Sequence, residues 1–536
     1  MFIIIQKLKN LFKIVISITI MTAVFLSLGC SNNDPVNIPT PANIPTLVPT
    51  PSIPLVLAEI VTPTPIPATP TLIPKLDKID ESVELGYKSS SNMYRFYSKP
   101  NHPIKVATEG LSKAISNKDV SQVPIILEIA RFFRNESFQE SVSEALSLLT
   151  KTPPEGNSWS WEQWMQFLWS NYQTYQVPDG YKAWKSILLS GFDRRYRQFF
   201  PPDGNVKPGL NLTEIIWGGI APDRTPFLTD PKVLNPENAE YLFGEDRVFG
   251  LSINGEHRAY PLRITSLHEV VNDVLGDIPI VLIHCVLCGS GNAYSSNILG
   301  VRSNFGTSGL IYRNSSLVYD LNNKTLWAPL TGEPIIGSLS DTNQTLEPLP
   351  LVLTTWNEWK QLHPETTVLS LSTDIFSNDS YISEFHPDSP LKKYLETDET
   401  VFPAWPISSQ LPPKSMVLGV KANGISKTYP ISILQEKTIL NDSIGETNIV
   451  ILTSAKTGAS RVFNRGDLKM EPVLTNLGNR DPNNLVDQNG NVWKFSEEAL
   501  FNKNLPTEKL LRKHSQISLW VSWYAFSPKT KVFIPK

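Results

Sequence analysis

The sequence predicts an α+β protein in which a small all-helical domain precedes a duplicated, strand-rich domain. Between Leu76 and Arg197, apolar residues recur at spacings of three and four, as in SQVPIILEIARFF, which is typical of amphipathic helices. After Pro201, short β-branched runs alternate with Gly, Asn and Asp turns, as in RVFGLSINGEHRAYPL, which is typical of strands and hairpins. This second pattern recurs without a gap at an offset of 169 residues (Val248 aligns with Val417), which predicts two copies of one unit.

Residues 1–29 have the features of a bacterial signal peptide. Three lysines precede an apolar run from Ile14 to Leu28, and Gly29-Cys30 follows the run directly. This junction resembles the lipobox of bacterial lipoproteins, although Ser27 stands where that motif usually has leucine. The resemblance implies cleavage before Cys30, a lipid on the Cys30 sulfur, and a protein anchored to a membrane in the cell envelope. The alternative is an uncleaved membrane anchor, and both interpretations place the rest of the chain outside the cytoplasm.

Residues 30–75 are predicted to be a lipidated stalk rich in proline and threonine, as in VTPTPIPATPTLIP. Proline removes backbone donors and favours extended polyproline II structure, so no folded domain is expected there. No later apolar stretch reaches the ~18 residues of a membrane-spanning helix. The net charge of −3 gives no electrostatic argument for binding nucleic acid, which requires a basic face, so no nucleic-acid partner is expected.

Three domains are predicted after the stalk: a helical domain (76–200), a first copy of the strand-rich domain (201–400) and a second, degenerate copy (401–536). The segment SWSWEQWMQFLWSNY in the helical domain carries four tryptophans: Trp159, Trp161, Trp164 and Trp169. Aromatic residues on helices more often form the core between them than a ligand surface, so we predict core packing here.

The two copies separate residues of the fold from candidate site residues. An Asn-Gly hairpin, a Tyr-Pro strand end and an Asn-Asp turn (Asn272-Asp273 and Asn441-Asp442) occur in both copies, and we assign them to the common backbone. Five side chains that could bind a metal or a proton occur only in the first copy. They are His268, Glu269, His284, Cys285 and Cys288, which become Lys437, Thr438, Thr453, Ser454 and Thr457. Their joint loss predicts a site in the first copy.

Several motifs resemble a known bacterial family. IIWGGIAPDRTPFL, AYPLRI, HEVVND and HCVLCGSGNAY occur in order, and the resemblance extends roughly from Ile215 to Phe463, with looser counterparts as far as Trp493. The family is the one called domain of unknown function 3179 (DUF3179). His284 and Val286 depart from its pattern, which more often has tyrosine and proline there. The resemblance implies an architecture and a set of recurring residues, but no settled activity.

The Cys285–Cys288 pair leaves two main interpretations open. Gly289 and Gly291 follow the pair and resist a helix, which disfavours a thioredoxin-like redox couple. As thiolates, the two cysteines would supply half of a tetrahedral shell for one transition-metal ion (Zn, Cu or Fe), with His268 as the next candidate ligand. His284 is a further candidate, but adjacent strand residues point to opposite faces, so it should diverge from Cys285. The other main interpretation is a local disulfide or two buried thiols.

Three functional classes follow from these candidates. We expect an extracytoplasmic metal- or ligand-binding module with its site around Cys285, Cys288, His268 and Glu269, and with a small-molecule or protein partner. The first alternative is a metal-assisted hydrolase or oxidoreductase in which Glu269 or His268 acts as the catalytic base. The second is a structural surface protein with a Cys285–Cys288 disulfide.

Other motifs are expected to be structural. His268 should lie on a short helix before a strand, and FGTSGL (residues 305–310) should be a turn, because it lacks the spacing of a phosphate loop. Asp320 and Trp327 have counterparts in the second copy. Arginines near the strand ends, such as Arg258 and Arg263, are expected to be solvated.

Overall fold

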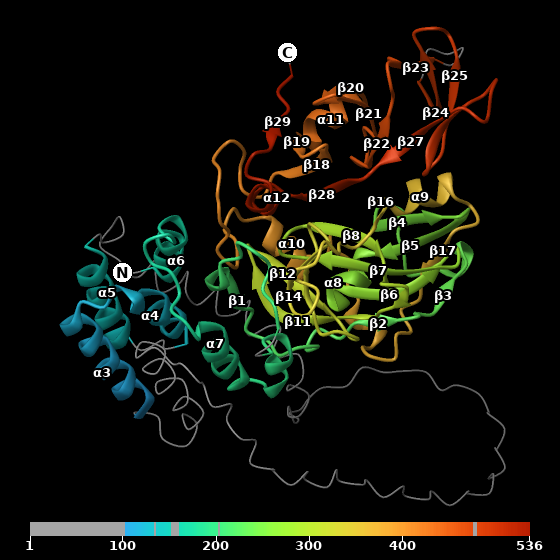
Figure 1. Ribbon diagram of the computed structural model, residues 1–536. Coiled ribbons are helices and arrows are strands. Elements are labelled where there is room, and N and C mark those ends of the chain that lie inside the picture. Colours follow the sequence, from blue (N-terminus) through green and yellow to red (C-terminus); the bar gives the residue numbers. More distant parts are fainter. Residues whose placement is uncertain (1–101, 133–135, 152–159, 202–203, 475–479, 536) are drawn as a thin grey trace, which may run out of the picture. The chain divides into compact units, whose positions relative to one another are not determined.

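The structure, a computed structural model, describes residues 102–132, 136–151, 160–201, 204–474 and 480–535 (Figure 1). The predicted signal peptide, the lipidation site Cys30, the stalk and Trp159 lie outside these residues. The described part contains both helices and strand-rich sheets, which confirms the predicted α+β class. Within this part of the chain, no helix has the length and apolar character needed to cross a membrane.

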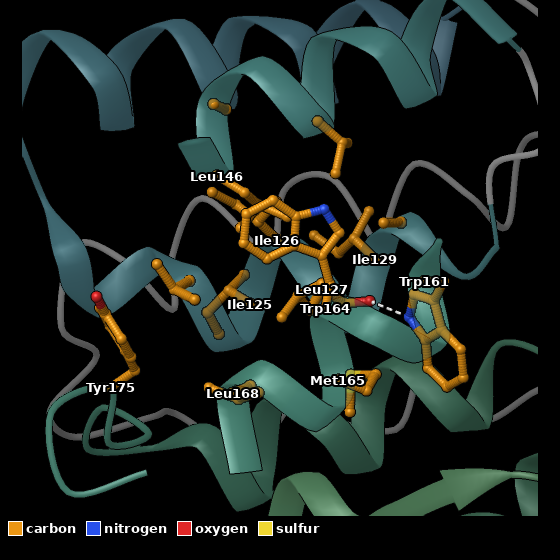
Figure 2. Close-up of a cluster of buried hydrophobic side chains, with 14 of the residues drawn as sticks. Ile125, Ile126, Leu127, Ile129, Leu146, Trp161, Trp164, Met165, Leu168 and Tyr175 are labelled. Carbon is orange, nitrogen blue, oxygen red and sulfur yellow. Dashed lines mark hydrogen bonds between the residues drawn. The ribbon is translucent and has the colours of Figure 1, made fainter. Parts of the chain in front are cut away.

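The first described segment is helical, as predicted. Its helices are α3 (His102–Asn117), α4 (Val123–Ala130), α5 (Glu136–Thr150), α6 (Trp161–Ser170) and α7 (Tyr181–Ser190). Side chains from α4, α5 and α6 form one apolar core, shown in Figure 2, in which Trp164 lies against the aliphatic residues of α4. The indole of Trp161 donates to the Leu127 carbonyl at 3.0 Å. Trp161, Trp164 and Trp169 are all buried, so the prediction of core packing is confirmed for them.

The first half of the strand-rich region, residues 215–369, is built from short strands, mostly antiparallel but with parallel β2–β6 and β5–β17 pairs, and from two short helices. Its elements are β1 (Ile215–Trp217), β2 (Leu228–Thr229), β3 (Val233–Leu234), β4 (Arg247–Ile253), β5 (Glu256–Pro261), α8 (Leu262–His268), β6 (Val270–Leu275), β7 (Ile278–Cys285), β8 (Ser290–Ser295), β9 (Asn297–Ile298), β10 (Val301–Arg302), β11 (Phe305–Tyr312), β12 (Ser315–Asp320), β13 (Leu326–Ala328), β14 (Glu333–Ile336), β15 (Pro348–Leu349), β16 (Leu351–Thr355), α9 (Trp356–Leu362) and β17 (Thr367–Leu369). Asn254 and Gly255 both have positive φ and form the predicted β4–β5 hairpin turn.

The second half, residues 416–532, follows a linker (residues 370–415) that carries α10 (Pro390–Leu395). Its elements are β18 (Met416–Ala422), β19 (Ile425–Pro430), α11 (Ile431–Lys437), β20 (Ile439–Ile444), β21 (Thr447–Thr453), β22 (Ser460–Asn464), β23 (Met470–Leu474), β24 (Arg480–Asp487), β25 (Val492–Phe495), β26 (Ala499–Asn502), β27 (Lys509–Lys513), β28 (Ser515–Leu519), α12 (Trp520–Phe526) and β29 (Lys531–Val532). Eight of these strands form one sheet, in the order β20-β21-β22-β27-β26-β25-β24-β23.

The two halves contain the same series of elements. The bounds of β4, β5, α8 and β6 reappear in β18, β19, α11 and β20 after a shift of 169 residues, and those of α9 reappear in α12 after a shift of 164. Three side-chain hydrogen bonds also recur. They are Tyr260 to Asp273 (2.8 Å) and Tyr429 to Asp442 (2.9 Å), Trp327 to Asp320 (2.9 Å) and Trp493 to Asp487 (3.1 Å), and Trp359 to Thr366 (2.8 Å) and Trp523 to Thr530 (3.1 Å).

In each half an asparagine amide bridges two strands that share no backbone ladder, and in the second half these are β20 and β23, the two edges of the eight-stranded sheet. In the first half, Asn272 on β6 accepts from the Phe305 amide at 2.7 Å and donates to the Phe305 carbonyl at 3.0 Å. In the second half, Asn441 on β20 makes the same pair of bonds to Met470 on β23, at 2.9 and 2.8 Å. Both asparagines therefore lie in strands, and the predicted Asn-Asp turn is wrong. In both halves the side-chain amide supplies the one acceptor and the one donor that a paired strand residue would otherwise supply.

Two other expectations about motifs are also wrong. FGTSGL lies within β11 and not in a turn, because the register shift between Thr307 and Ile311 lets a glycine-rich segment continue the strand. The arginines near the strand ends are paired with carboxylates. Arg258 contacts Asp273 at 2.6 Å, and Arg263, which is buried, contacts Asp246.

Glycine is required where each half packs a strand against a tryptophan. A Cβ at Gly250 would lie 2.3 Å from the Trp359 ring, and one at Gly419 would lie 2.2 Å from the Trp523 ring. We therefore expect Gly250→Ala and Gly419→Ala each to destabilise the protein by ~1–3 kcal/mol, measured by urea and thermal unfolding. Gly110→Ala on α3 is the matched control, because its Cβ would contact nothing and alanine favours a helix. Equal unfolding temperatures for Gly250→Ala and the wild type would contradict this account.

Candidate functional site

The cysteine pair closes the turn between β7 and β8. Cys285 and Cys288 are fully buried and joined in a disulfide. The backbone amide of Cys288 donates to the Cys285 sulfur at 3.3 Å. The pair therefore adopts one of the two arrangements that the sequence left open, and in this form its sulfurs are bonded to each other and are not thiolates.

The counterpart turn in the second half has the same shape without cysteine. The amide of Thr457 donates to the Ser454 hydroxyl at 3.3 Å, which matches the Cys288–Cys285 contact. Both hydroxyls then donate to one carboxylate oxygen of Glu358, Ser454 at 2.8 Å and Thr457 at 2.6 Å. We call this arrangement the carboxylate clip. A turn of this shape is thus closed covalently in the first half and by hydrogen bonds in the second.

His284 and Cys285 diverge, as alternation along a strand predicts. The Nδ1 atom of His284 lies 2.9 Å from the Thr265 hydroxyl on α8, and its ring meets Phe249 on β4 edge to face. The Cys285 sulfur instead lies 3.8 Å from the Ser315 hydroxyl on β12. Burial lowers the pKa of His284 to about 3, with a smaller effect from the nearby Arg247 cation, so His284 stays neutral.

His268 ends α8, on the short helix predicted for it, and both of its ring nitrogens have partners. Nδ1 lies 2.6 Å from the Pro226 carbonyl, which can only accept, so Nδ1 carries the proton. Nε2 lies 2.8 Å from the Tyr381 hydroxyl and accepts from it. Burial lowers the pKa of His268, which favours this neutral form. The histidine therefore holds the linker, through Tyr381, against the loop at Pro226.

The structure does not bring the predicted metal ligands into one cluster. The cysteines lie beside Leu330 and Ser315, whereas His268 lies among Pro226, Phe376 and Tyr381. Among the described residues, no group of three or more His, Cys, Asp or Glu side chains could hold a metal ion.

Glu269 has a backbone conformation that belongs to the fold. Its φ is 56°, its amide donates to the Thr265 carbonyl at 2.8 Å, and its carbonyl accepts from His284 at 2.7 Å. Thr438 in the second half also has a positive φ, and its carbonyl accepts from Thr453 at 2.7 Å. The turn after the helix is therefore shared, and only the carboxyl group is special to the first half.

The Glu269 carboxyl has a pKa near neutral pH. Burial raises its pKa to about 7, and a hydrogen bond with the Ser316 hydroxyl offsets part of that rise. Part of the residue nevertheless remains exposed to solvent. A carboxyl of this kind can accept or donate a proton, or a hydrogen bond, at physiological pH.

Ser316 and Tyr381 are site residues that the sequence comparison missed. Ser316 lies on β12, where the offset between the two halves has already changed from 169 to 167 (Asp320 matches Asp487), so the ungapped alignment no longer pairs the right residues. Tyr381 belongs to the linker and follows only the first half.

The strand-rich part of the chain matches a known protein family. A family described as "Protein of unknown function (DUF3179)" matches residues 222–530. The chain belongs to this family. The match extends beyond the expected end at Phe463 and covers nearly all of both strand-rich halves, so the DUF3179 domain includes the second half as well as the first. Comparisons with curated proteins and with solved structures give no match.

The pKa of Glu269 predicts a specific pH dependence of stability. Because the folded value is about 7 and the ordinary value 4.5, the folded state retains the proton longer, and Glu269 lowers stability as pH rises from 4.5 to 7. The full loss is at most about 3 kcal/mol. We expect Glu269→Gln to remove it, so the variant gains unfolding free energy relative to the wild type between about pH 5 and about pH 8 in urea titrations. A difference between the two proteins that stays constant over this range would refute the raised pKa.

Proposed function

We propose that this DUF3179 protein is an extracytoplasmic lipoprotein whose first half binds a small ligand, and that Glu269 contacts the ligand. One observation carries the proposal: the Glu269 carboxyl is desolvated and poised near neutral pH, yet it belongs to none of the contacts that recur in both halves. Holding a carboxyl there lowers stability above neutral pH, and sites with such a penalty are commonly functional.

We also propose that the two halves are copies of one duplicated domain, of which only the first retains the site. Three observations support this idea: the recurring element bounds, the strand-bridging Asn272 and Asn441, and the matching turns that begin at Cys285 and Ser454. At the Glu269 position the second half has Thr438, which keeps the backbone turn but has no ionisable group.

The chemistry of the site favours a ligand that bears an amine or a hydroxyl group. Glu269, after α8, and Ser316, on β12, present a carboxyl and a hydroxyl group side by side. A cationic amine would stabilise the charged carboxylate and lower its pKa, whereas a hydroxyl could donate to either oxygen. The same near-neutral pKa suits a general acid or base, so an enzyme that uses Glu269 in this role is the second candidate.

Binding of one Zn, Cu or Fe ion remains a proposal for the reduced protein. The Cys288 amide would stabilise a thiolate at Cys285, because it already donates to that sulfur. Two thiolates are half of a tetrahedral shell, and the remaining ligands would come from His268 or His284 after they leave their present partners, or from solvent.

One set of unfolding measurements tests these ideas. We expect amine- or hydroxyl-bearing probes such as glucosamine to raise the unfolding temperature of the wild type, and Glu269→Gln to abolish the rise. Glu446→Gln, at an exposed position in the second half, is the matched control and should keep it. If Zn²⁺ stabilises the thiol-reduced protein but not Cys285→Ser, the metal proposal is supported. Probe-induced shifts that survive unchanged in Glu269→Gln would overturn the ligand role of that residue.

The lipid anchor rests on the N-terminal sequence. Cleavage before Cys30 would place a lipid on its sulfur and hold the folded part near a membrane. We expect cells that express the chain to incorporate labelled palmitate into it, and Cys30→Ala to abolish the label and release the protein from membranes. Equal labelling of both proteins would contradict the proposal.

A further inference from the structure

We propose that the Cys285–Cys288 disulfide is a redox-sensitive latch that holds the linker and the second half against the first half. The proposal is independent of the ligand-binding role of Glu269. It concerns the four-residue turn from Cys285 to Cys288, in which the carbonyl groups of Leu287 and Cys288 accept hydrogen bonds from two other parts of the chain.

Backbone carbonyls of this turn carry the contacts. The Cys288 carbonyl accepts from the Leu519 amide at 2.7 Å, at the junction of β28 and α12 in the second half. The Leu287 carbonyl accepts from the Tyr394 hydroxyl on α10 of the linker at 2.8 Å, and from Asn314 at 3.3 Å. The turn thus serves as an acceptor for both partners, and its shape determines whether these bonds form.

Packing tightens the same contact. A Cβ at Gly289 would lie 2.9 Å from Leu519, so the turn approaches β28 as closely as a backbone can. On the linker side, Lys414 lies 3.7 Å from the centre of the Tyr394 ring and also bonds the Tyr394 carbonyl. Because these surfaces already touch, a change in the turn is transmitted directly to both partners.

The opposite docking contact does not depend on redox state. There the turn of the second half meets α9 of the first half through the carboxylate clip, in which Ser454 and Thr457 donate to Glu358. The position equivalent to Glu358 on α12 is Ser522, which is buried and contacts Asn314 at 3.5 Å. Two related turns therefore contribute to the contact between the halves, one closed by a reducible bond and one by hydrogen bonds that a reductant leaves intact. Side-chain bonds outside the turns, such as Gln516 to Asn292 at 2.7 Å and Arg313 to the Ala525 carbonyl at 2.8 Å, join the halves as well.

Reduction has a defined chemical balance. A dithiol donates two electrons and two protons, the S–S bond breaks to give two thiols, and the dithiol becomes a disulfide. Each freed sulfur then needs the space of a non-bonded neighbour, in a region filled by Leu330, Leu287 and Phe526. Because both sulfurs are fully buried, the extra volume must displace the turn, which weakens the bonds at Leu287 and Cys288.

Hydrogen exchange on the full chain tests the latch. The reporter is the Leu519 amide, which donates to Cys288, and the reference is the clip-closed turn at residues 454–458. With excess dithiothreitol we expect exchange at Leu519 to become at least ~10-fold faster while the reference stays unchanged. Alkylation of both cysteines, detected by mass spectrometry, should accompany the change. A disulfide that stays intact in the native protein under excess dithiol would overturn the proposal, as would full reduction without faster exchange at Leu519.

Matched variants separate the covalent bond from the side chains that make it. Cys285→Ser with Cys288→Thr copies the second-half turn without its carboxylate, and should show fast exchange at Leu519 with or without reductant. Adding Ser522→Glu transfers the clip, and should restore slow exchange that no longer responds to dithiothreitol. If that triple variant fails to fold, Ser454→Cys with Thr457→Cys makes the reverse transfer and should render the reference turn sensitive to reductant. Insensitivity of the doubly cysteine-substituted turn, once its disulfide is confirmed, would count against the latch.

Discussion

In each strand-rich half, the side-chain amide of one asparagine joins two strands that share no backbone ladder. Asn272 and Asn441 each pair with both backbone groups of a single residue, Phe305 and Met470. The end of α8, the end of β7 and the start of β12 lie together, because the His284 amide donates to the Glu269 carbonyl at 2.7 Å and the Cys285 sulfur lies 3.8 Å from the Ser315 hydroxyl. Glu269, the cysteine pair and Ser316 come from these three places.

The candidate site residues divide into two groups by what they contact. His268, Cys285 and Cys288 make contacts that hold neighbouring segments: the histidine bonds the linker, and the cysteine turn bonds the linker and the second half. His284 contacts Thr265 on α8. Glu269 alone has a carboxyl whose burial is unfavourable for its charged form and whose only contribution from a neighbouring side chain is the Ser316 hydroxyl. This contrast distinguishes a candidate ligand contact from residues that assemble the protein.

The recurring pattern in the two halves predicted the fold well and the site less well. Residues present in both halves do serve a common backbone arrangement, as Trp327 with Asp320 and Trp493 with Asp487 demonstrate. The candidate residues without a counterpart in the second half were all expected to belong to one site. The structure separates them, because the halves have different neighbours: only the first is followed by the linker, and each turn docks on a different helix. A residue can therefore occur in only one half because its docking partner differs. The Asn-Asp motif shows the complementary case, in which a shared asparagine bridges two strands and does not form a turn.

By itself, the sequence determined the α+β class, the helical core tryptophans, the β4–β5 hairpin and the recurrence of one pattern at a constant offset. These features depend on local periodicity and on turn residues, which act over a few neighbouring positions. Four contacts are visible only in the tertiary structure. Asn272 bonds Phe305, His268 bonds Tyr381, Glu269 lies beside Ser316, and the cysteine turn accepts from Leu519. Each of these contacts joins residues 33 or more positions apart, from Asn272 and Phe305 (33) to His268 and Tyr381 (113) and beyond. Periodicity carries no information about such pairs, because their approach is determined by how strands curve and pack and not by the spacing of residues along the chain.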